Sequence, residues 1–233
     1  MQDIKSNVEM RISMKEFRVL EIKESIFEDN NKDAQRLREQ LKRENTFLLN
    51  LMSSPGAGKT TTLVNTIHRL KDKLSIAVME ADIDSDVDAR TISKTGVKVI
   101  QLHTGGMCHL DADMTRQGLQ GLDAKGTDLV ILENVGNLVC PAEFDTGATK
   151  NAMILSVPEG DDKPLKYPLM FQVSDALIIN KIDTMEVFDF NLELCIERVK
   201  KLNPNIAIFP LSAKTGEGME AWTEWLYREV KGE

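Results

Sequence analysis

The sequence has few aromatic residues, few cysteines and no long hydrophobic run, and each shortage excludes a class of protein. Aromatic residues make up 5% of the 233 residues, although apolar residues together reach 42%, enough for a sizeable core. Three cysteines are too few and too widely spaced for a disulfide framework. No run of membrane-spanning length and no signal peptide is present. The composition therefore predicts a reduced, cytoplasmic protein with no membrane partner.

Positive charge is also in short supply. Lysine and arginine total 29 against 37 aspartate and glutamate residues, which gives a net charge of −8. Proteins that bind nucleic acid need a basic face to neutralise phosphates, and the acidic balance argues against such a face. We therefore expect no nucleic-acid partner.

The most informative stretch runs from an apolar segment, 47–52, through a glycine-rich turn to a helical pattern over 61–70. The turn reads SSPGAGKT, in the strand–turn–helix context that a phosphate-binding loop requires. Its glycines allow backbone N–H groups to surround phosphate oxygens. Lys59 is expected to reach the β- and γ-phosphates, and Thr60 to place its hydroxyl on Mg²⁺. Ser53 departs from the usual pattern, which begins with glycine. The candidate nucleotide-binding residues here are Ser54, Gly56, Ala57, Gly58, Lys59, Thr60 and Thr61.

A second candidate strand, residues 75–79, leads into an acidic run that extends to Asp88. Acidic runs usually form solvated surface. This one begins where a strand ends, which is where open parallel sheets bind ligands. A carboxylate there serves to bind Mg²⁺ through water or to orient the attacking water. Asp82 is the nearer candidate, and Asp84 is the alternative.

Residues 128–133 form another apolar strand, which ends in the carboxylate of Glu133. This pattern is typical of the second nucleotide-binding motif, with Glu where Asp is commoner. Glu133 is therefore a candidate for Mg²⁺ binding and, with Lys59 and Asp82, for catalysis. Gly136 follows in a turn whose backbone N–H is expected to contact the γ-phosphate.

A third motif indicates which base is bound. The apolar strand 176–179 continues into Asn180, Lys181 and Asp183, in the pattern Asn-Lys-x-Asp. The Asp183 carboxylate can accept hydrogen bonds from guanine N1–H and its 2-amino group, which adenine does not offer together. Lys181 is expected to lie along the base, and Asn180 to connect this loop to the phosphate-binding loop. The segment Ser212, Ala213 and Lys214 is expected to offer a backbone N–H to the guanine 6-oxo group.

The remaining patterns predict an α/β fold of the P-loop NTPase type, with a mostly parallel sheet flanked by helices. Residues 1–45 are predicted to form a short N-terminal arm and helix packed on a GTPase domain, 46–233. Within the arm, residues 17–22 suit either a short strand or a helical turn, and Asn30-Asn31 are expected to cap a helix. The other expected strands are 97–102, 152–157 and 206–209; the expected helices are 32–43, 111–124, 187–202 and 219–230; and a loop is expected over 158–168.

Cys108, His109 and Cys140 form a candidate metal site, because thiolate and imidazole groups suit Zn²⁺ and Ni²⁺. Cys140 lies four residues after Gly136. A metal there would be attached to the turn that senses the γ-phosphate, and coupling between two sites is reciprocal. The alternative is that the cysteines only pack in the core.

Three ligands leave one position of a tetrahedral site open, and a two-fold dimer would fill it by bringing two such sets together. His103 is a minor candidate ligand. Cys195 lies in a helical pattern and is interpreted as a packing residue, whereas His68 is interpreted as a surface residue.

The chain resembles the hydrogenase maturation GTPases that insert nickel, the HypB family, from about residue 30 onward. The specific segments are HTGGMCHLDADM and ILENVGNLVCPAEFD; the others are SSPGAGKT, ADIDSDVDAR, PEGDDKPLKYP, NKID and SAKTGEG. The resemblance implies a SIMIBI-class fold, slow hydrolysis of GTP to GDP with Mg²⁺, and a GTP-promoted homodimer. It also implies a Ni²⁺ or Zn²⁺ site at the dimer interface, for which the matching ligands are Cys108, His109 and Cys140.

The implied partners are other hydrogenase maturation proteins and the hydrogenase large-subunit precursor, to which nickel would be delivered. Residues 1–30 contain no cysteine or histidine, so a separate N-terminal metal-storage site is not expected. Two alternatives remain open. One is the related GTPase that inserts nickel into urease, which the segment CHLDA together with Cys140 disfavours. The other is a nucleotide-binding metal buffer or regulatory module with negligible turnover.

Overall fold

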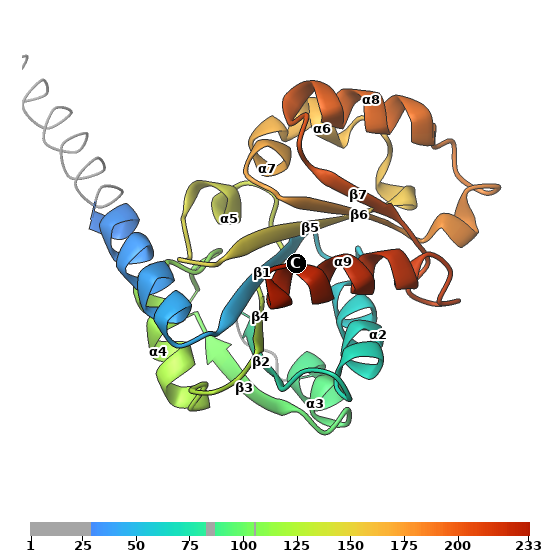
Figure 1. Ribbon diagram of the computed structural model, residues 1–233. Coiled ribbons are helices and arrows are strands. Elements are labelled where there is room, and N and C mark those ends of the chain that lie inside the picture. The colour runs from blue at the N-terminus through green and yellow to red at the C-terminus, as the bar shows by residue number, and fades with distance from the viewer. Residues whose placement is uncertain (1–28, 83–86, 105) are drawn as a thin grey trace, which may run out of the picture.

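The computed structural model describes residues 29–82, 87–104 and 106–233. They form a seven-stranded sheet in the order β3-β2-β4-β1-β5-β6-β7 (Figure 1), and all six strand pairs are parallel. The strands are β1 (Phe47–Ser53), β2 (Ile76–Asp82), β3 (Lys98–His103), β4 (Leu129–Glu133), β5 (Lys150–Ser156), β6 (Ala176–Asn180) and β7 (Ala207–Pro210). The predicted α/β class with a parallel sheet is confirmed.

The central strands are apolar along their whole length because helices cover both faces of the sheet. Every residue of β1 is buried. One face is covered by α2 (Lys59–Leu70), α3 (Val87–Ser93) and α9 (Met219–Lys231), as Figure 1 shows. Trp222 of α9 is buried in this layer and donates from Nε1 to Thr66 Oγ1 of α2 at 2.9 Å. The expectation that the tryptophans of the last helix belong to the core is confirmed.

The opposite face is covered by the helix over residues 29–43 and by three further helices. These are α4 (Ala112–Leu122), α7 (Pro168–Gln172) and α8 (Leu192–Leu202). In Figure 1 the helix 29–43 lies beside α4, and their buried leucines share one cluster: Leu37, Leu41, Leu119 and Leu122. The division of the chain at residue 45 stays a prediction. Residues 17–22 and Asp84 lie outside the described residues.

Several expected boundaries were wrong, for identifiable reasons. The helix expected from residue 187 begins only at Leu192, because the Asn191 side chain accepts a hydrogen bond from Leu194 N and caps it. Val187 is instead 79% exposed. The loop expected over 158–168 contains short helices that prolines initiate: η1 (Val157–Glu159), α6 (Lys163–Lys166) and the start of α7. The strand expected at 152–157 is β5, two residues earlier at its start.

Beside those in the expected loop, three further short helices among the described residues were not predicted: α3, α5 (Cys140–Glu143) and η2 (Ile182–Thr184). Asn30 and Asn31 lie within the helix 29–43 and do not cap it. The Asn30 side chain instead bonds to two other segments. Within the described ranges, no helix is both long and apolar enough to span a bilayer.

The parallel arrangement decides where a site can form. Because every strand runs in the same direction, all carboxyl ends meet at one edge of the sheet, where ligands bind in open α/β folds. The loops after β1, β3, β4 and β6 all begin at this edge, and they carry the candidate residues.

Candidate functional site

The loop between β1 and α2 has the conformation that phosphate binding requires. Gly56 and Gly58 have φ values of +77° and +95°, which place them in the left-handed region that favours glycine. Lys59 Nζ donates to Ser53 Oγ at 3.1 Å, and Ser53 Oγ donates to the Ser54 carbonyl at 2.7 Å. Serine at the first position of the loop therefore fits the turn, and its hydroxyl holds the lysine over the loop.

A hydroxyl and a carboxylate meet at the edge of this loop. Thr60 Oγ1 at the start of α2 donates to Glu133 Oε1 at the end of β4 at 3.3 Å, and Glu133 is only 2% exposed. Both residues line a cavity of about 450 Å³, together with Lys59 and Gly136. Hydroxyl and carboxylate oxygens are the ligands that Mg²⁺ prefers, so these two residues fit that ion. Asp82 ends the neighbouring strand β2, which pairs with β4.

Sequence reasoning missed one contact of the phosphate-binding loop. Ser54 Oγ donates to the Glu159 carboxylate, which also accepts from Ser156 N at 2.8 Å and Ser156 Oγ at 2.7 Å. Glu159 thereby connects the loop to the carboxyl end of β5. The signal was available, since Pro158-Glu159-Gly160 directly follows an apolar strand.

The loop after β6 is tied to the phosphate-binding loop from both sides. Asn180 Nδ2 donates to the Ala57 carbonyl at 2.9 Å, as expected, and Lys181 Nζ donates to the Gly56 carbonyl at 2.7 Å. A Cβ atom at Gly58 would lie 2.5 Å from Asn180 Nδ2, so only glycine fits there. These contacts fix the distance between the phosphate and base ends of the pocket.

The remaining candidate residues for base binding lie on both sides of Asn180. Asn180 Oδ1 accepts from Lys181 N at 2.8 Å and from Ala213 N at 3.0 Å. Ser212 is buried, and Lys214 is exposed. Asp183 in η2 is also exposed, so its carboxylate is accessible to a base.

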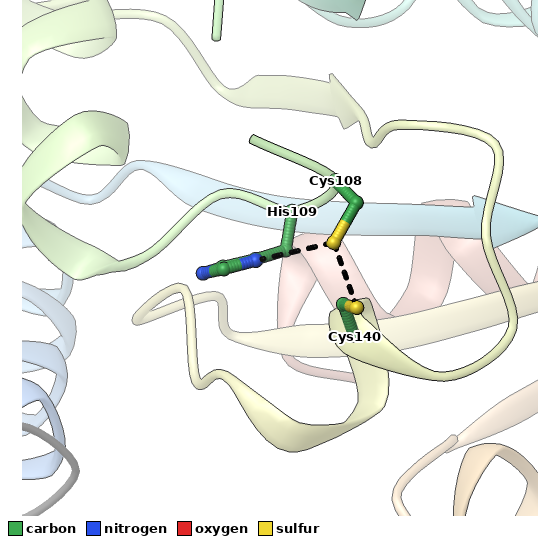
Figure 2. Close-up of side chains that lie close together, drawn as sticks. All are labelled: Cys108, His109 and Cys140. Carbon is green, nitrogen blue, oxygen red and sulfur yellow. Dashed lines mark hydrogen bonds between the residues drawn. The ribbon is translucent and has the colours of Figure 1, made fainter. Parts of the chain in front are cut away.

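The structure brings Cys108, His109 and Cys140 together (Figure 2). Their ligand atoms all lie within 4.8 Å of one another. Cys108 Sγ lies 2.7 Å from Cys140 Sγ and 3.8 Å from His109 Nδ1. Cys108 and His109 come from the loop after β3, and Cys140 begins α5, 32 residues later in the sequence. Two sulfurs and one imidazole form a donor set for Zn²⁺ or Ni²⁺.

Electrostatics favour the metal-binding form of His109 and oppose that of Cys140. Burial lowers the pKa of His109, against the opposing effects of the Asp111 and Glu143 carboxylates, and so favours the neutral imidazole that binds metals. The hydrogen bond with Cys108 and, after it, burial raise the pKa of the Cys140 thiol. Metal binding must displace that proton, so affinity for the metal falls as pH falls.

An aromatic contact holds His109 in place. The Phe144 ring, one residue past α5, stacks on the His109 ring with centroids 3.7 Å apart and an interplanar angle of 15°. Sequence reasoning did not identify Phe144. Its position just after Cys-Pro-Ala-Glu gave no sign that the two rings would meet.

Other candidate ligands lie elsewhere. Among the described residues, His103 and Cys195 are not part of the metal-binding group. His103 is exposed at the end of β3. Cys195 is buried in α8, where burial raises the pKa of its thiol to about 12, so the packing interpretation holds. His68 is exposed on α2, as expected.

The cavity beside the phosphate-binding loop and the cluster of Cys108, His109 and Cys140 share the loop after β4. The loop begins at Asn134, whose Nδ2 donates to Asn50 Oδ1 at 3.0 Å inside the sheet. Gly136 then packs against Pro55 of the phosphate-binding loop, with only 3.1 Å between a Cβ placed on it and Pro55 Cγ. Four residues later the chain reaches Cys140.

Comparison with known proteins agrees with this geometry. A family model described as "CobW/HypB/UreG, nucleotide-binding domain" matches residues 47–210. The hydrogenase maturation factor HypB of Rhizobium leguminosarum bv. viciae is 45% identical over 213 residues, covering 91% of this chain and 71% of that protein. The chain belongs to the HypB branch of the CobW/HypB/UreG family.

Two further HypB proteins extend the comparison. The hydrogenase/urease maturation factor HypB of Helicobacter pylori strain J99 is 42% identical over 216 residues, covering 91% of this chain and 88% of that protein. A crystal structure of HypB from Helicobacter pylori in complex with nickel superposes with a TM-score of 0.82 at 41% identity, covering 88% and 96% of the two chains. The P-loop nucleotide-binding fold expected from the sequence is thereby confirmed.

The stacking of Phe144 on His109 leads to a testable consequence. In the variant Phe144→Ala, water reaches the imidazole, the burial penalty on the charged form falls, and the pKa of His109 rises. We expect this rise in a pH titration of the His109 ring protons by NMR of the metal-free protein. Phe144→Trp retains a ring and should keep the pKa low, with the His68 signals as internal reference. Identical titration in Phe144→Ala and the unsubstituted protein would show that the ring does not shield His109.

Proposed function

We propose that the protein is a GTP-hydrolysing nickel metallochaperone for the maturation of nickel–iron hydrogenase. One observation carries this proposal. Cys108, His109 and Cys140 converge within 4.8 Å, and Cys140 lies on the loop that leaves the nucleotide cavity at Glu133. Such an arrangement suits a protein that binds a metal in one nucleotide state and releases it in the other.

The nucleotide half of the mechanism is mostly positioning and electrostatics, because phosphoryl transfer asks little covalent work of the protein. Backbone N–H groups of residues 56–61 surround the phosphates, and Lys59 moves from Ser53 to the β- and γ-phosphates. Thr60 and Glu133, with Asp82, would hold Mg²⁺, which would neutralise charge on the phosphate oxygens. Asp82 also orients the attacking water, and Gly136 N–H contacts the γ-phosphate.

The residues that contact the base give the site its preference for guanine. Asp183 accepts from N1–H and the 2-amino group, while Lys181 lies along the ring. The segment Ser212, Ala213 and Lys214 would offer a backbone N–H to the 6-oxo group; in the structure the Ala213 N–H donates to Asn180 Oδ1 at 3.0 Å. Adenine has neither an N1–H nor a 2-amino group, so it would leave the carboxylate without both donors, which costs affinity.

Nickel is the cargo, and zinc fits the same donors, so metal availability decides which ion is bound. Each chain offers three ligands, and pairing two chains about a two-fold axis completes the coordination. We expect GTP to promote this homodimer. The metal then passes to the hydrogenase large-subunit precursor with the help of other maturation proteins.

A urease-related role is the second candidate. The Helicobacter pylori J99 relative is named a hydrogenase/urease maturation factor. The same nickel site would serve both roles, and only the receiving apoprotein would differ.

Nucleotide preference tests the enzymatic half of the proposal. We expect phosphate release with GTP and little with ATP. Asp183→Ala should lower the preference for GTP at least about a hundredfold, since two charge-assisted hydrogen bonds of about 1.5–3 kcal/mol each are lost. Glu186→Ala, also exposed and three residues further on, is the matched control. Absence of GTP-dependent phosphate release at every nickel occupancy would favour the metal buffer with negligible turnover.

Nickel titration tests the metal half. Cys108→Ala and Cys140→Ala should each weaken Ni²⁺ binding by more than about a hundredfold. Loss of a residue that only supports a ligand typically lowers metal affinity about 10–100-fold, and loss of a ligand should cost more. Cys195→Ala, buried in α8 away from the group, should bind Ni²⁺ normally. Sedimentation of the same samples measures dimer formation, which we expect to be greater with a non-hydrolysable GTP analogue than with GDP. Unchanged Ni²⁺ affinity in both variants would reduce the two cysteines to packing residues.

A further inference from the structure

The first described helix contacts both chain segments that carry the candidate metal ligands. Asn30 Nδ2 donates to the Asp145 carbonyl at 3.0 Å, and Asn30 Oδ1 accepts from Ala112 N at 3.0 Å. A single amide side chain therefore uses its donor on one segment and its acceptor on the other.

These two backbone groups lie close to the ligands along the chain. Ala112 is the first residue of α4, three residues after His109, and its N–H has no carbonyl partner within the helix. Asp145 directly follows Phe144, which stacks on His109, and lies five residues after Cys140. Asn30 thus joins the segment of Cys108 and His109 to the segment of Cys140.

A second set of contacts from the same helix holds the Asp145 segment. Arg38 Nη2 donates to both carboxylate oxygens of Asp145 at 2.8 Å, and Arg38 Nε donates to the Ala148 carbonyl at 2.9 Å. Gly147, with φ +77°, packs so closely that a Cβ atom would lie 2.9 Å from a Leu37 methyl group. The turn after Phe144 is therefore seated on the helix, and Asn30 extends this contact to α4.

We propose that Asn30 is a positioning residue of the metal site, an inference that rests on the proposed nickel-binding function. Among the described residues, no backbone hydrogen bond is found between the two segments that carry the ligands, so their separation depends on other contacts. A side chain bonded to both fixes this separation. Mutation of residues that hold metal ligands in position typically lowers metal affinity about 10–100-fold.

A structural role and a positioning role of Asn30 predict different effects when the side chain is lost. If Asn30 only anchors its helix, its loss lowers the thermal stability and affects nucleotide and metal binding alike. If it sets the distance between the ligands, its loss weakens metal binding and alters the spectrum of the bound metal, while GDP binding stays the same.

The experiment uses the full chain with Asn30→Ala, Asn30→Asp and the control Gln40→Ala. Gln40 is exposed on the same helix, and its side chain donates to Glu44, one residue past the helix end. Ni²⁺ affinity is measured by competition with a chromophoric chelator, and the sulfur-to-nickel charge-transfer band is recorded at saturation. GDP affinity and the melting temperature are measured in parallel.

We expect Asn30→Ala to weaken Ni²⁺ binding about tenfold and to change the charge-transfer band, with GDP affinity equal to that of Gln40→Ala. Asn30→Asp retains the acceptor for Ala112 N and loses the donor, so its Ni²⁺ affinity should be intermediate. It also provides the test if Asn30→Ala does not fold.

Two outcomes would overturn the proposal. Equal Ni²⁺ affinity and spectra in the Asn30 variants and Gln40→Ala would show that the bridge does not position the ligands. A parallel loss of Ni²⁺ affinity, GDP affinity and melting temperature would assign Asn30 a general structural role. The variant Cys108→Ala distinguishes failure of the metal site from failure of the role of Asn30. If Cys108→Ala also binds Ni²⁺ normally, the proposed metal site is wrong. If Cys108→Ala loses Ni²⁺ binding while the Asn30 variants keep it, only the role of Asn30 is wrong.

Discussion

The close packing of Gly136 against Pro55 is the constraint on which this account depends. A side chain at Gly136 would come within 3.1 Å of Pro55 Cγ and 3.3 Å of Pro55 N, so the two loops lie in direct contact at this point. If a γ-phosphate draws in Gly136, as we propose, the loop after β4 is displaced. That loop leads to α5, which carries Cys140 and ends beside the ring that supports His109. One displacement thus reaches one metal ligand directly and another through its aromatic support.

Anchored residues on both sides of the loop after β4 define the segment that can respond to the nucleotide. Asn134 is held by its hydrogen bonds to Asn50 Oδ1 and the Leu51 carbonyl, both at 3.0 Å. At the other end, Asp145 is held by Asn30 and Arg38 of the helix 29–43. Residues 135–144 lie between these two anchors. A short segment between rigid anchors is the kind of element that responds to a bound phosphate in nucleotide-dependent switches.

The fold was largely predictable because its strands are apolar runs that end in recognisable motifs. Each motif lies at a carboxyl end, and the parallel topology then brings them together. The convergence of Cys108, His109 and Cys140 was expected, but its supports were not. Phe144 and Asn30 act through contacts between residues 35 or more apart in sequence, which no local pattern encodes. Glu159 also acts across the sequence, on Ser54, although its position directly after an apolar strand was a usable signal. Short helices such as α5 were missed because four residues show no periodicity.

The most direct test of the shared loop is the Ni²⁺ dissociation constant measured with GDP bound and again with a non-hydrolysable GTP analogue bound. The account predicts different values, and linkage requires that Ni²⁺ change the ratio of the two nucleotide affinities by the same factor. For coupling of about 1–3 kcal/mol, that factor is about 5–150. Equal nickel affinities in the two nucleotide states would contradict the account, because the two sites would then share a loop without being energetically coupled through it.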